Sequence, residues 1–194
     1  MAEFVSFFNC SFDSATSTWR WTETGQFTSA SAYQYLHNPG IRCSTQKDLR
    51  RMKIPMKVKS FIWLMLEGKI LTQDVLIYRG CQVPQGCTLC GSNRVETKDH
   101  ILWNCVYAIR FRFDLMAHFK ISFRGGGENI KDVWIKGQVG LQKNQKIRWS
   151  TIWAAGVWGL WRERNIRILY GIRRVEHMLV SQTAQKIQLW MVGH

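Results

Sequence analysis

The sequence contains no apolar run long enough to cross a membrane. Its longest apolar segment covers residues 152–161 and ends at Arg162-Glu163-Arg164, which makes it about half the length of a transmembrane helix. Residues 1–14 contain no basic cluster followed by an extended apolar stretch, the pattern that marks a secretory signal peptide. We therefore expect an intracellular protein, nuclear or cytoplasmic, that is neither secreted nor held in a membrane.

Paired catalytic carboxylates are also absent from the sequence. Enzymes that transfer phosphoryl groups hold magnesium ions between clustered aspartates, but no two aspartates are adjacent here; they are Asp13, Asp48, Asp74, Asp99, Asp114 and Asp132. No carboxylate cluster suited to a ribonuclease H or an endonuclease is visible, and His118 and His177 lack a supporting nucleophile motif. The glycine-rich segment 124–128 lacks the Gly-Lys-Ser/Thr ending of a phosphate-binding loop. The sequence therefore predicts no enzyme activity.

Acidic residues are few compared with basic ones. The chain has 27 Lys and Arg against 13 Asp and Glu, a formal net charge of +14. An excess of this kind favours polyanionic partners, because contacts between cationic side chains and phosphates release counterions. RNA or DNA is therefore the partner that the charge indicates.

The basic residues are concentrated in two segments. Residues 42–59 hold one acid, Asp48, against seven cations: Arg42, Lys47, Arg50, Arg51, Lys53, Lys57 and Lys59. In the second segment, residues 162–174, arginines lie close to Trp158, Trp161 and Tyr170, and basic groups beside aromatic rings can hold a nucleic-acid backbone while bases stack. The alternative is a solvated helix face. The candidate phosphate contacts are Lys53, Lys57, Lys59, Arg162, Arg164, Arg167, Arg173 and Arg174.

Four potential metal ligands stand at regular spacing in the middle of the chain. Cys87, Cys90, His100 and Cys105 form a Cys-x2-Cys-x9-His-x4-Cys array. Three thiolates and one imidazole suit tetrahedral zinc, and four protein ligands leave no open position for catalysis. The alternatives are buried cysteines that act as small apolar residues and a redox dithiol. The array therefore predicts a structural zinc site, which also requires a reducing compartment.

The other cysteines fit this site less well. Cys81 precedes Cys87 by six residues and could replace it as a ligand, although Pro84 and Gly86 intervene. Cys10 and Cys43 have no partner at ligand spacing, and we interpret both as ordinary thiols. Whether Cys81 contributes to the metal site stays open at this stage.

The apolar periodicity predicts a mainly α protein. Pro55 is expected in the first turn of a helix whose buried face carries Val58, Phe61, Ile62 and Met65, and Gly68 ends that helix. A shorter helix follows between Thr72 and Gly80, and another between His100 and Phe119. We expect a small helical domain around the zinc knuckle and then a C-terminal helical pair. The predicted divisions are a segment 1–18, the zinc domain 19–120, a connector 121–147 and a Trp- and Arg-rich helical region 148–194.

Three stretches of the sequence resemble a known family. They are GQFTSASAY at 25–33, KIPMKVKSFIWLMLEGKILTQDVLIYRG at 53–80 and CTLCGSNRVETKDHILWNC at 87–105. Together they resemble the zinc-binding domain found downstream of reverse transcriptases, in the form common in plant non-LTR retrotransposons. The segment WGLWRERNIRIL at 158–169 is similar to one that often follows this domain. A tryptophan expected near position 111 is Phe111 here. The positions that carry the resemblance are Gly25, Phe27, Thr28, Ser31, Ala32, Tyr33, Pro55, Lys57, Lys59, Phe61, Trp63, Thr72, Asp74, Leu76, Cys87, Cys90, Glu96, Thr97, His100 and Cys105.

The resemblance and the charge lead to two hypotheses. In the first, the chain is a zinc-binding accessory domain that binds RNA or DNA without catalysis, near a reverse transcriptase supplied as a separate polypeptide. In the second, it is a structural or protein-interaction domain, or a non-functional remnant of the element, with no nucleic-acid role. A steep dependence of binding on salt distinguishes the first from the second.

Overall fold

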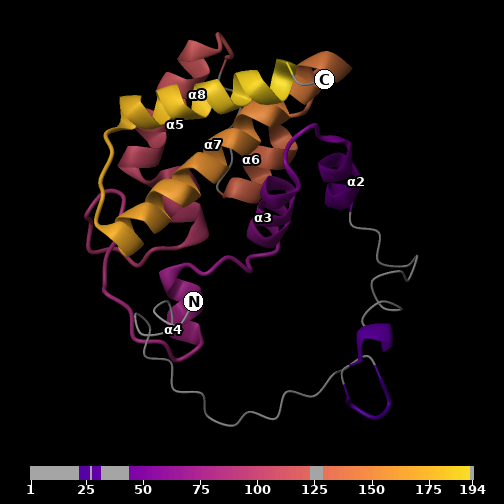
Figure 1. Ribbon diagram of the computed structural model, residues 1–194, viewed down its shortest axis with the longest axis vertical. Coiled ribbons are helices and arrows are strands. Elements are labelled where there is room, and N and C mark those ends of the chain that lie inside the picture. The colour runs from indigo at the N-terminus through magenta and orange to yellow at the C-terminus, as the bar shows by residue number, and fades with distance from the viewer. Residues whose placement is uncertain (1–21, 27, 32–43, 123–128, 193–194) are drawn as a thin grey trace.

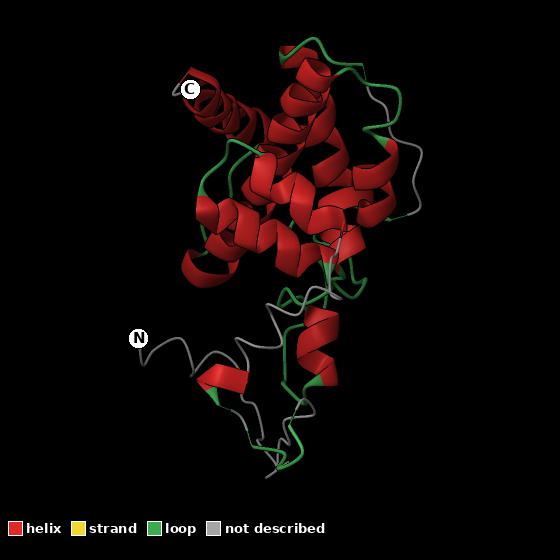
Figure 2. Cartoon of the chain, turned by 90° about the vertical axis from the view of Figure 1, so that its right-hand side faces the viewer, coloured by secondary structure: helices red, strands yellow, loops and turns green. Residues whose placement is uncertain are grey.

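The computed structural model describes residues 22–26, 28–31, 44–122 and 129–192. The expectations for the segment 1–18, for Cys10 and Cys43 and for Tyr33 lie outside these residues. The described helices are α2 (Ser44–Arg51), α3 (Met56–Leu66), α4 (Gln73–Tyr78), the π-helical turn η2 (His100–Asn104), α5 (Val106–His118), α6 (Ile130–Lys136), α7 (Lys143–Tyr170) and α8 (Glu176–Val192). Figure 2 shows this part of the chain as helices joined by loops, and the predicted mainly α class is confirmed.

Helix α7 is the centre of the arrangement. Helices α3, α5 and α8 pack against it, and Figure 1 shows α8 crossing α7 and α5 while α4 lies apart from this group of helices. The close crossing depends on small residues. A Cβ atom on Gly159 would lie 2.9 Å from Thr183 Oγ1 of α8, and one on Gly156 would lie 3.3 Å from Leu115 Cδ2 of α5. Glycine at these two positions therefore allows three helices to share one core.

The expected helices around α3 and α4 are present. Val58, Phe61, Ile62 and Met65 form the buried face of α3, and Pro55 precedes its first residue. Thr72 is the N-cap of α4. Gly68 has a φ angle of 69°, which a residue without a Cβ adopts at no steric cost. The chain can thus reverse after α3, which ends at Leu66, and begin α4 at Gln73.

The zinc motif and the C-terminal helices share a single hydrophobic cluster. Its members run from Leu49 to Ile187 and include Cys87, Cys105, and Trp149 and Trp153 of α7. The segment expected as a connector, residues 121–147, contains α6, whose Trp134 packs 4.8 Å from Trp153 and 5.9 Å from Trp149 between ring centroids. Helix α6 is therefore part of the core, because Trp134 is as buried as the two α7 tryptophans that it contacts.

Candidate metal centre

The Cys87–Cys90 loop is folded back by its own backbone. The Cys87 N–H donates to the Ser92 carbonyl at 2.7 Å, and the Gly91 N–H donates to the Cys87 carbonyl at 2.8 Å. Gly86 has a φ angle of 100°, and a Cβ atom there would lie 2.8 Å from the Ser92 carbonyl oxygen. This turn places both thiols of the Cys-x2-Cys pair on the same side of the loop.

The second half of the ligand set comes from η2 and the residue after it. The His100 N–H donates to Thr97 Oγ1 at 3.0 Å, and the Cys105 N–H donates to the His100 carbonyl at 2.7 Å. Cys105 is extended, with φ −65° and ψ 134°, and α5 begins after it. The continuous helix expected from His100 to Phe119 is therefore interrupted at Cys105, where the chain turns the thiol toward Cys87.

The four side chains converge to the dimensions of a zinc site. Their ligand atoms all lie within 4.8 Å of one another. The Cys87 and Cys105 sulfurs are 3.8 Å apart, and Cys90 Sγ is 3.6 Å from His100 Nε2. Zinc bonds of about 2.3 Å to sulfur and about 2.05 Å to nitrogen at tetrahedral angles require separations of about 3.8 Å and about 3.6 Å. The donor set and its geometry thus fit zinc, and Cys81, buried just after α4, does not belong to this group.

The protonation of the ligands is consistent with metal binding. The hydrogen bond between Cys87 and Cys105 raises the pKa of the Cys87 thiol, as does burial, and it lowers the pKa of Cys105. Cysteine binds zinc as the thiolate, so a metal ion at this pair would displace the thiol protons. Burial, assisted by Arg94, lowers the pKa of His100. The imidazole is consequently neutral at neutral pH, which is the form that coordinates metal.

Comparison with known proteins identifies the region around this cluster. Residues 27–111 match the family model described as zinc-binding in reverse transcriptase. This match agrees with the resemblance of the sequence to the zinc-binding domain of reverse transcriptases. Over 154 residues the chain is 25% identical to the Arabidopsis thaliana protein named "Putative ribonuclease H protein At1g65750"; the match covers 76% of this chain and 24% of that relative. No solved structure is significantly similar to the chain. Among the described residues, no helix is long and apolar enough to cross a membrane.

Helix α7 holds the loops of the zinc-binding domain through two buried arginines. Arg164 Nη2 lies 2.6 Å from Glu96 Oε1, and both side chains are almost fully buried. Arg167 lies 2.7 Å from Glu163 and donates to the carbonyl of Leu89, inside the Cys87–Cys90 loop, at 2.8 Å. The structural unit therefore extends past residue 111, because α7 supplies the partners of polar groups within the family match.

A further arginine contacts the segment between His100 and Cys105. Arg112 donates to the Leu102 carbonyl at 2.9 Å, and its guanidinium lies 3.7 Å from the centroid of the Trp103 ring. Burial lowers the pKa of Arg112 to about 10, although the neighbouring Cys105 acts in the opposite direction. This side chain fixes the turn that carries two of the four ligands.

The eight candidate phosphate contacts fall into two sets. Arg164 and Arg167 are buried against carboxylates, and Arg174 lies 3.3 Å from Glu163 Oε2. Lys59 is half-buried and donates to the Arg50 carbonyl at 3.1 Å. The remaining four, Lys53, Lys57, Arg162 and Arg173, are exposed. A nucleic-acid interface can consequently use these four and Lys59, whereas Arg164, Arg167 and Arg174 neutralise buried acids.

Two structural roles were missed at the sequence level. Glu163 and Arg167 stand at i and i+4 on a helix, a spacing at which opposite charges pair, so this contact had a local signal. Glu96 and Arg164 are 68 positions apart, and no sequence pattern links them. The predicted charge clusters therefore mixed surface cations with residues that the core requires.

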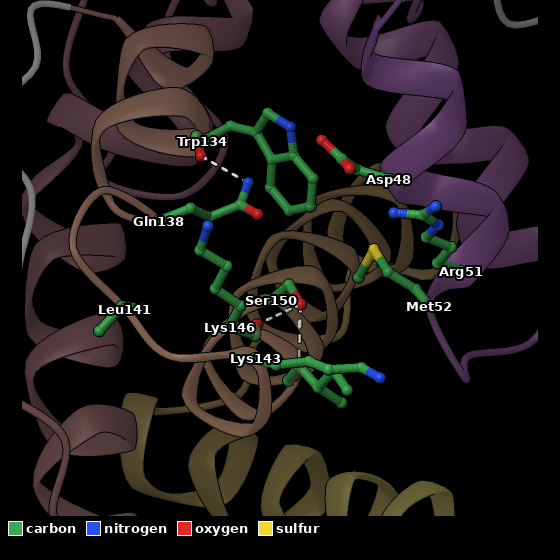
Figure 3. Close-up of a pocket in the computed structure, with 10 residues that line it drawn as sticks. Asp48, Arg51, Met52, Trp134, Gln138, Leu141, Lys143, Lys146 and Ser150 are labelled. Atoms are coloured by element: carbon green, nitrogen blue, oxygen red, sulfur yellow. Dashed lines mark hydrogen bonds between the residues drawn. The ribbon is translucent and has the colours of Figure 1, made fainter.

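One cavity in the described part of the chain is lined by none of the four zinc ligands. It measures about 670 Å³ and is lined by α2, α6 and the first turns of α7. Figure 3 shows Asp48, Arg51 and Met52 on one side and Trp134 and Gln138 on another, with Lys143 and Lys146 between them. None of the predicted ligands or phosphate contacts lines this cavity.

Proposed function

We propose that this chain is a non-catalytic accessory module that binds RNA or DNA for a retrotransposon reverse transcriptase on a separate polypeptide. The zinc centre organises the loops between α4 and α5, and Arg164 and Arg167 attach these loops to α7. The surface cations on α3, α7 and α8 contact phosphates. The Arabidopsis relative, named as a ribonuclease H protein, supports an association with nucleic-acid enzymes.

The observation that carries this proposal is the convergence of cations from three helices. Phe61 of α3 stacks on Trp161 of α7, with ring centroids 5.7 Å apart, so Lys57, one turn before Phe61, lies near Arg162. Gly159 of α7 faces Thr183 of α8, so Lys186, about one turn further along α8, reaches the same place. Burial lowers the pKa of Lys186, and the charges of Arg162, Arg174 and Lys57 lower it further. Mutual repulsion of this kind is relieved when a polyanion binds.

The proposal is tested by titrating the zinc-loaded chain with labelled single-stranded RNA and duplex DNA across a salt series. We expect the logarithm of the binding constant to fall steeply with the logarithm of the salt concentration, by about 0.7 per phosphate for single strands and about 0.9 for duplex DNA. Arg162→Glu should weaken binding to all sequences alike and reduce the slope by about 1.

The matched control is Lys131→Glu, which makes the same change of charge on the exposed surface of α6. We expect it to alter binding less than twofold. No binding at low salt by the folded, zinc-loaded chain would refute the proposal. Equal losses in Arg162→Glu and Lys131→Glu would show that net charge, not this surface, determines binding.

A protein-interaction role is the second candidate, because α5 exposes an apolar face. Phe113 is 73% exposed and Ile109 is 48% exposed, and hollows of about 450 Å³ and about 270 Å³ lie beside them. In this role, binding to a protein partner would be nearly independent of salt, since an apolar interface releases few counterions.

A further inference from the structure

The cavity between α2, α6 and α7 has a cationic rim without enough acid to balance it. Arg51, Lys143 and Lys146 line it and are exposed, and Asp48 is the acidic residue in its wall. None of the three cations belongs to a salt bridge recorded for the described residues. The cavity therefore presents a net positive charge to solvent.

The direction of α7 adds to this positive charge. Lys143 and Lys146 occupy the first turn of a 28-residue helix, where no acidic residue is present, and the helix dipole contributes roughly half a positive charge at that end. Gln142 and Gln145 form a capping box, which satisfies backbone N–H groups without supplying negative charge. Lysines at these positions destabilise the free helix slightly, and a bound anion would reverse that effect.

The inner wall of the cavity is apolar, unlike its cationic rim, and this indicates what kind of anion fits. Met52 and Trp134 are buried there, and Leu141 and Ile147 complete an apolar surface. The volume of about 670 Å³ lies within the range of small-molecule sites, about 300–1,000 Å³. A bare phosphate ion would leave this apolar surface uncovered. An anion that carries a flat, weakly polar ring would contact both parts.

We propose that this cavity binds one nucleotide, with its phosphate beside Arg51, Lys143 and Lys146 and its base against Met52, Leu141 and Ile147. If the nucleotide belongs to a nucleic-acid strand, this site rests on the proposed function and adds a defined binding position to it. The nucleotide is either a unit of single-stranded RNA or DNA, or a free mononucleotide. Both sources share the chemistry of a nucleoside monophosphate.

Two variants separate the phosphate contact from the base contact. Lys146→Glu removes a cation and places an acid in the first turn of α7, which favours the helix, so the variant should fold. Ile147→Ser reduces the apolar wall at a position that is 42% exposed and leaves the charges intact. Lys131→Glu, on the exposed face of α6 outside the cavity, is the control for net charge.

The probes are a single-stranded oligonucleotide, adenosine monophosphate and inorganic phosphate, each titrated into the zinc-loaded full chain by calorimetry at fixed salt. We expect Lys146→Glu to weaken both nucleotide probes and phosphate by tenfold or more. Ile147→Ser should weaken the nucleotide probes three- to tenfold and leave phosphate unchanged. Lys131→Glu should change each probe less than twofold.

The outcomes distinguish this site from the proposed function. If Lys146→Glu reduces oligonucleotide binding no more than Lys131→Glu does, the cavity site is refuted. The proposed function is retained in that case. Binding of the mononucleotide without binding of the oligonucleotide would support the cavity as a free-nucleotide site and refute the proposed function. If no probe binds, both are refuted. Loss of phosphate binding in Ile147→Ser would contradict the assignment of the base to the apolar wall.

Discussion

At the scale of single residues, we expect the local fold to depend most on the four candidate zinc ligands. The loop from Cys87 to Cys105 has little regular structure, and its two cysteine-bearing turns meet at the metal cluster. We expect Cys90→Ala or Cys105→Ala to release zinc and to unfold the region around residues 55–115, because structural zinc contributes on the order of 10 kcal/mol to small sites. Zinc content and far-ultraviolet circular dichroism measure both effects.

Cys81→Ala is the control for this prediction, since Cys81 is buried but lies outside the cluster. It should retain one zinc ion per chain. Unchanged zinc content and circular dichroism in both ligand variants would contradict the assignment, and loss of zinc from Cys81→Ala would show that the ligand set includes another cysteine.

Glu163 is the second residue whose loss should be severe. Its fully buried carboxylate accepts from Arg167 at 2.7 Å and from the Arg174 N–H at 2.9 Å, and lies 3.3 Å from the Arg174 guanidinium. Glu163→Gln keeps the shape of the side chain but leaves the positive charges of Arg167 and Arg174 without their carboxylate. This should lower the free energy of unfolding by about 3–5 kcal/mol. Urea unfolding of the zinc-loaded chain measures this loss.

Glu176→Gln makes the same chemical change at a pair nearer the surface, Arg110–Glu176, whose side chains are 70% and 26% exposed and whose charged atoms are 4.0 Å apart. A contribution of about 1 kcal/mol or less is expected there. If the two variants were equally stable, the buried network around Glu163 would not be a major source of stability.

At the scale of helices, the contact between α6 and α7 depends on Gly137. This residue caps α6 with a φ angle of −63°, so alanine would be acceptable to the backbone alone. However, a Cβ atom at this position would overlap the Trp149 ring. We expect Gly137→Ala to lower the free energy of unfolding by about 1–3 kcal/mol, the usual cost of overpacking, as measured by thermal or urea unfolding.

A double-mutant cycle identifies the cause of that loss. Trp149→Leu removes the ring and should be destabilising by itself, but adding Gly137→Ala to it should cost much less than in the parent chain. Additive effects in the cycle would show that α6 and α7 do not meet through these two residues.

At the scale of the whole molecule, contacts between residues close together in the sequence could be predicted, whereas contacts between distant segments could not. The four zinc ligands lie within nineteen consecutive positions, from Cys87 to Cys105, and short spacing alone predicts their convergence. The buried face of α3 and the turn at Gly68 follow equally from nearby residues. The pairing of Arg164 with Glu96 and the packing of Trp134 on α7 join segments far apart in the chain. Such contacts depend on how the helices assemble, which periodicity does not specify.

The attachment of α7 to the zinc loops also constrains how this sequence can be inherited. The family match ends at residue 111, but Arg164 neutralises Glu96 and Arg167 holds the Leu89 carbonyl from beyond that limit. Recombination at residue 111 would therefore leave Glu96 without its partner in one product and Arg164 without its partner in the other, whereas Arg167 would keep Glu163. We expect exchanges between related elements to be rejected when the breakpoint falls between residues 96 and 164, so that the zinc motif and α7 pass to descendants as one unit.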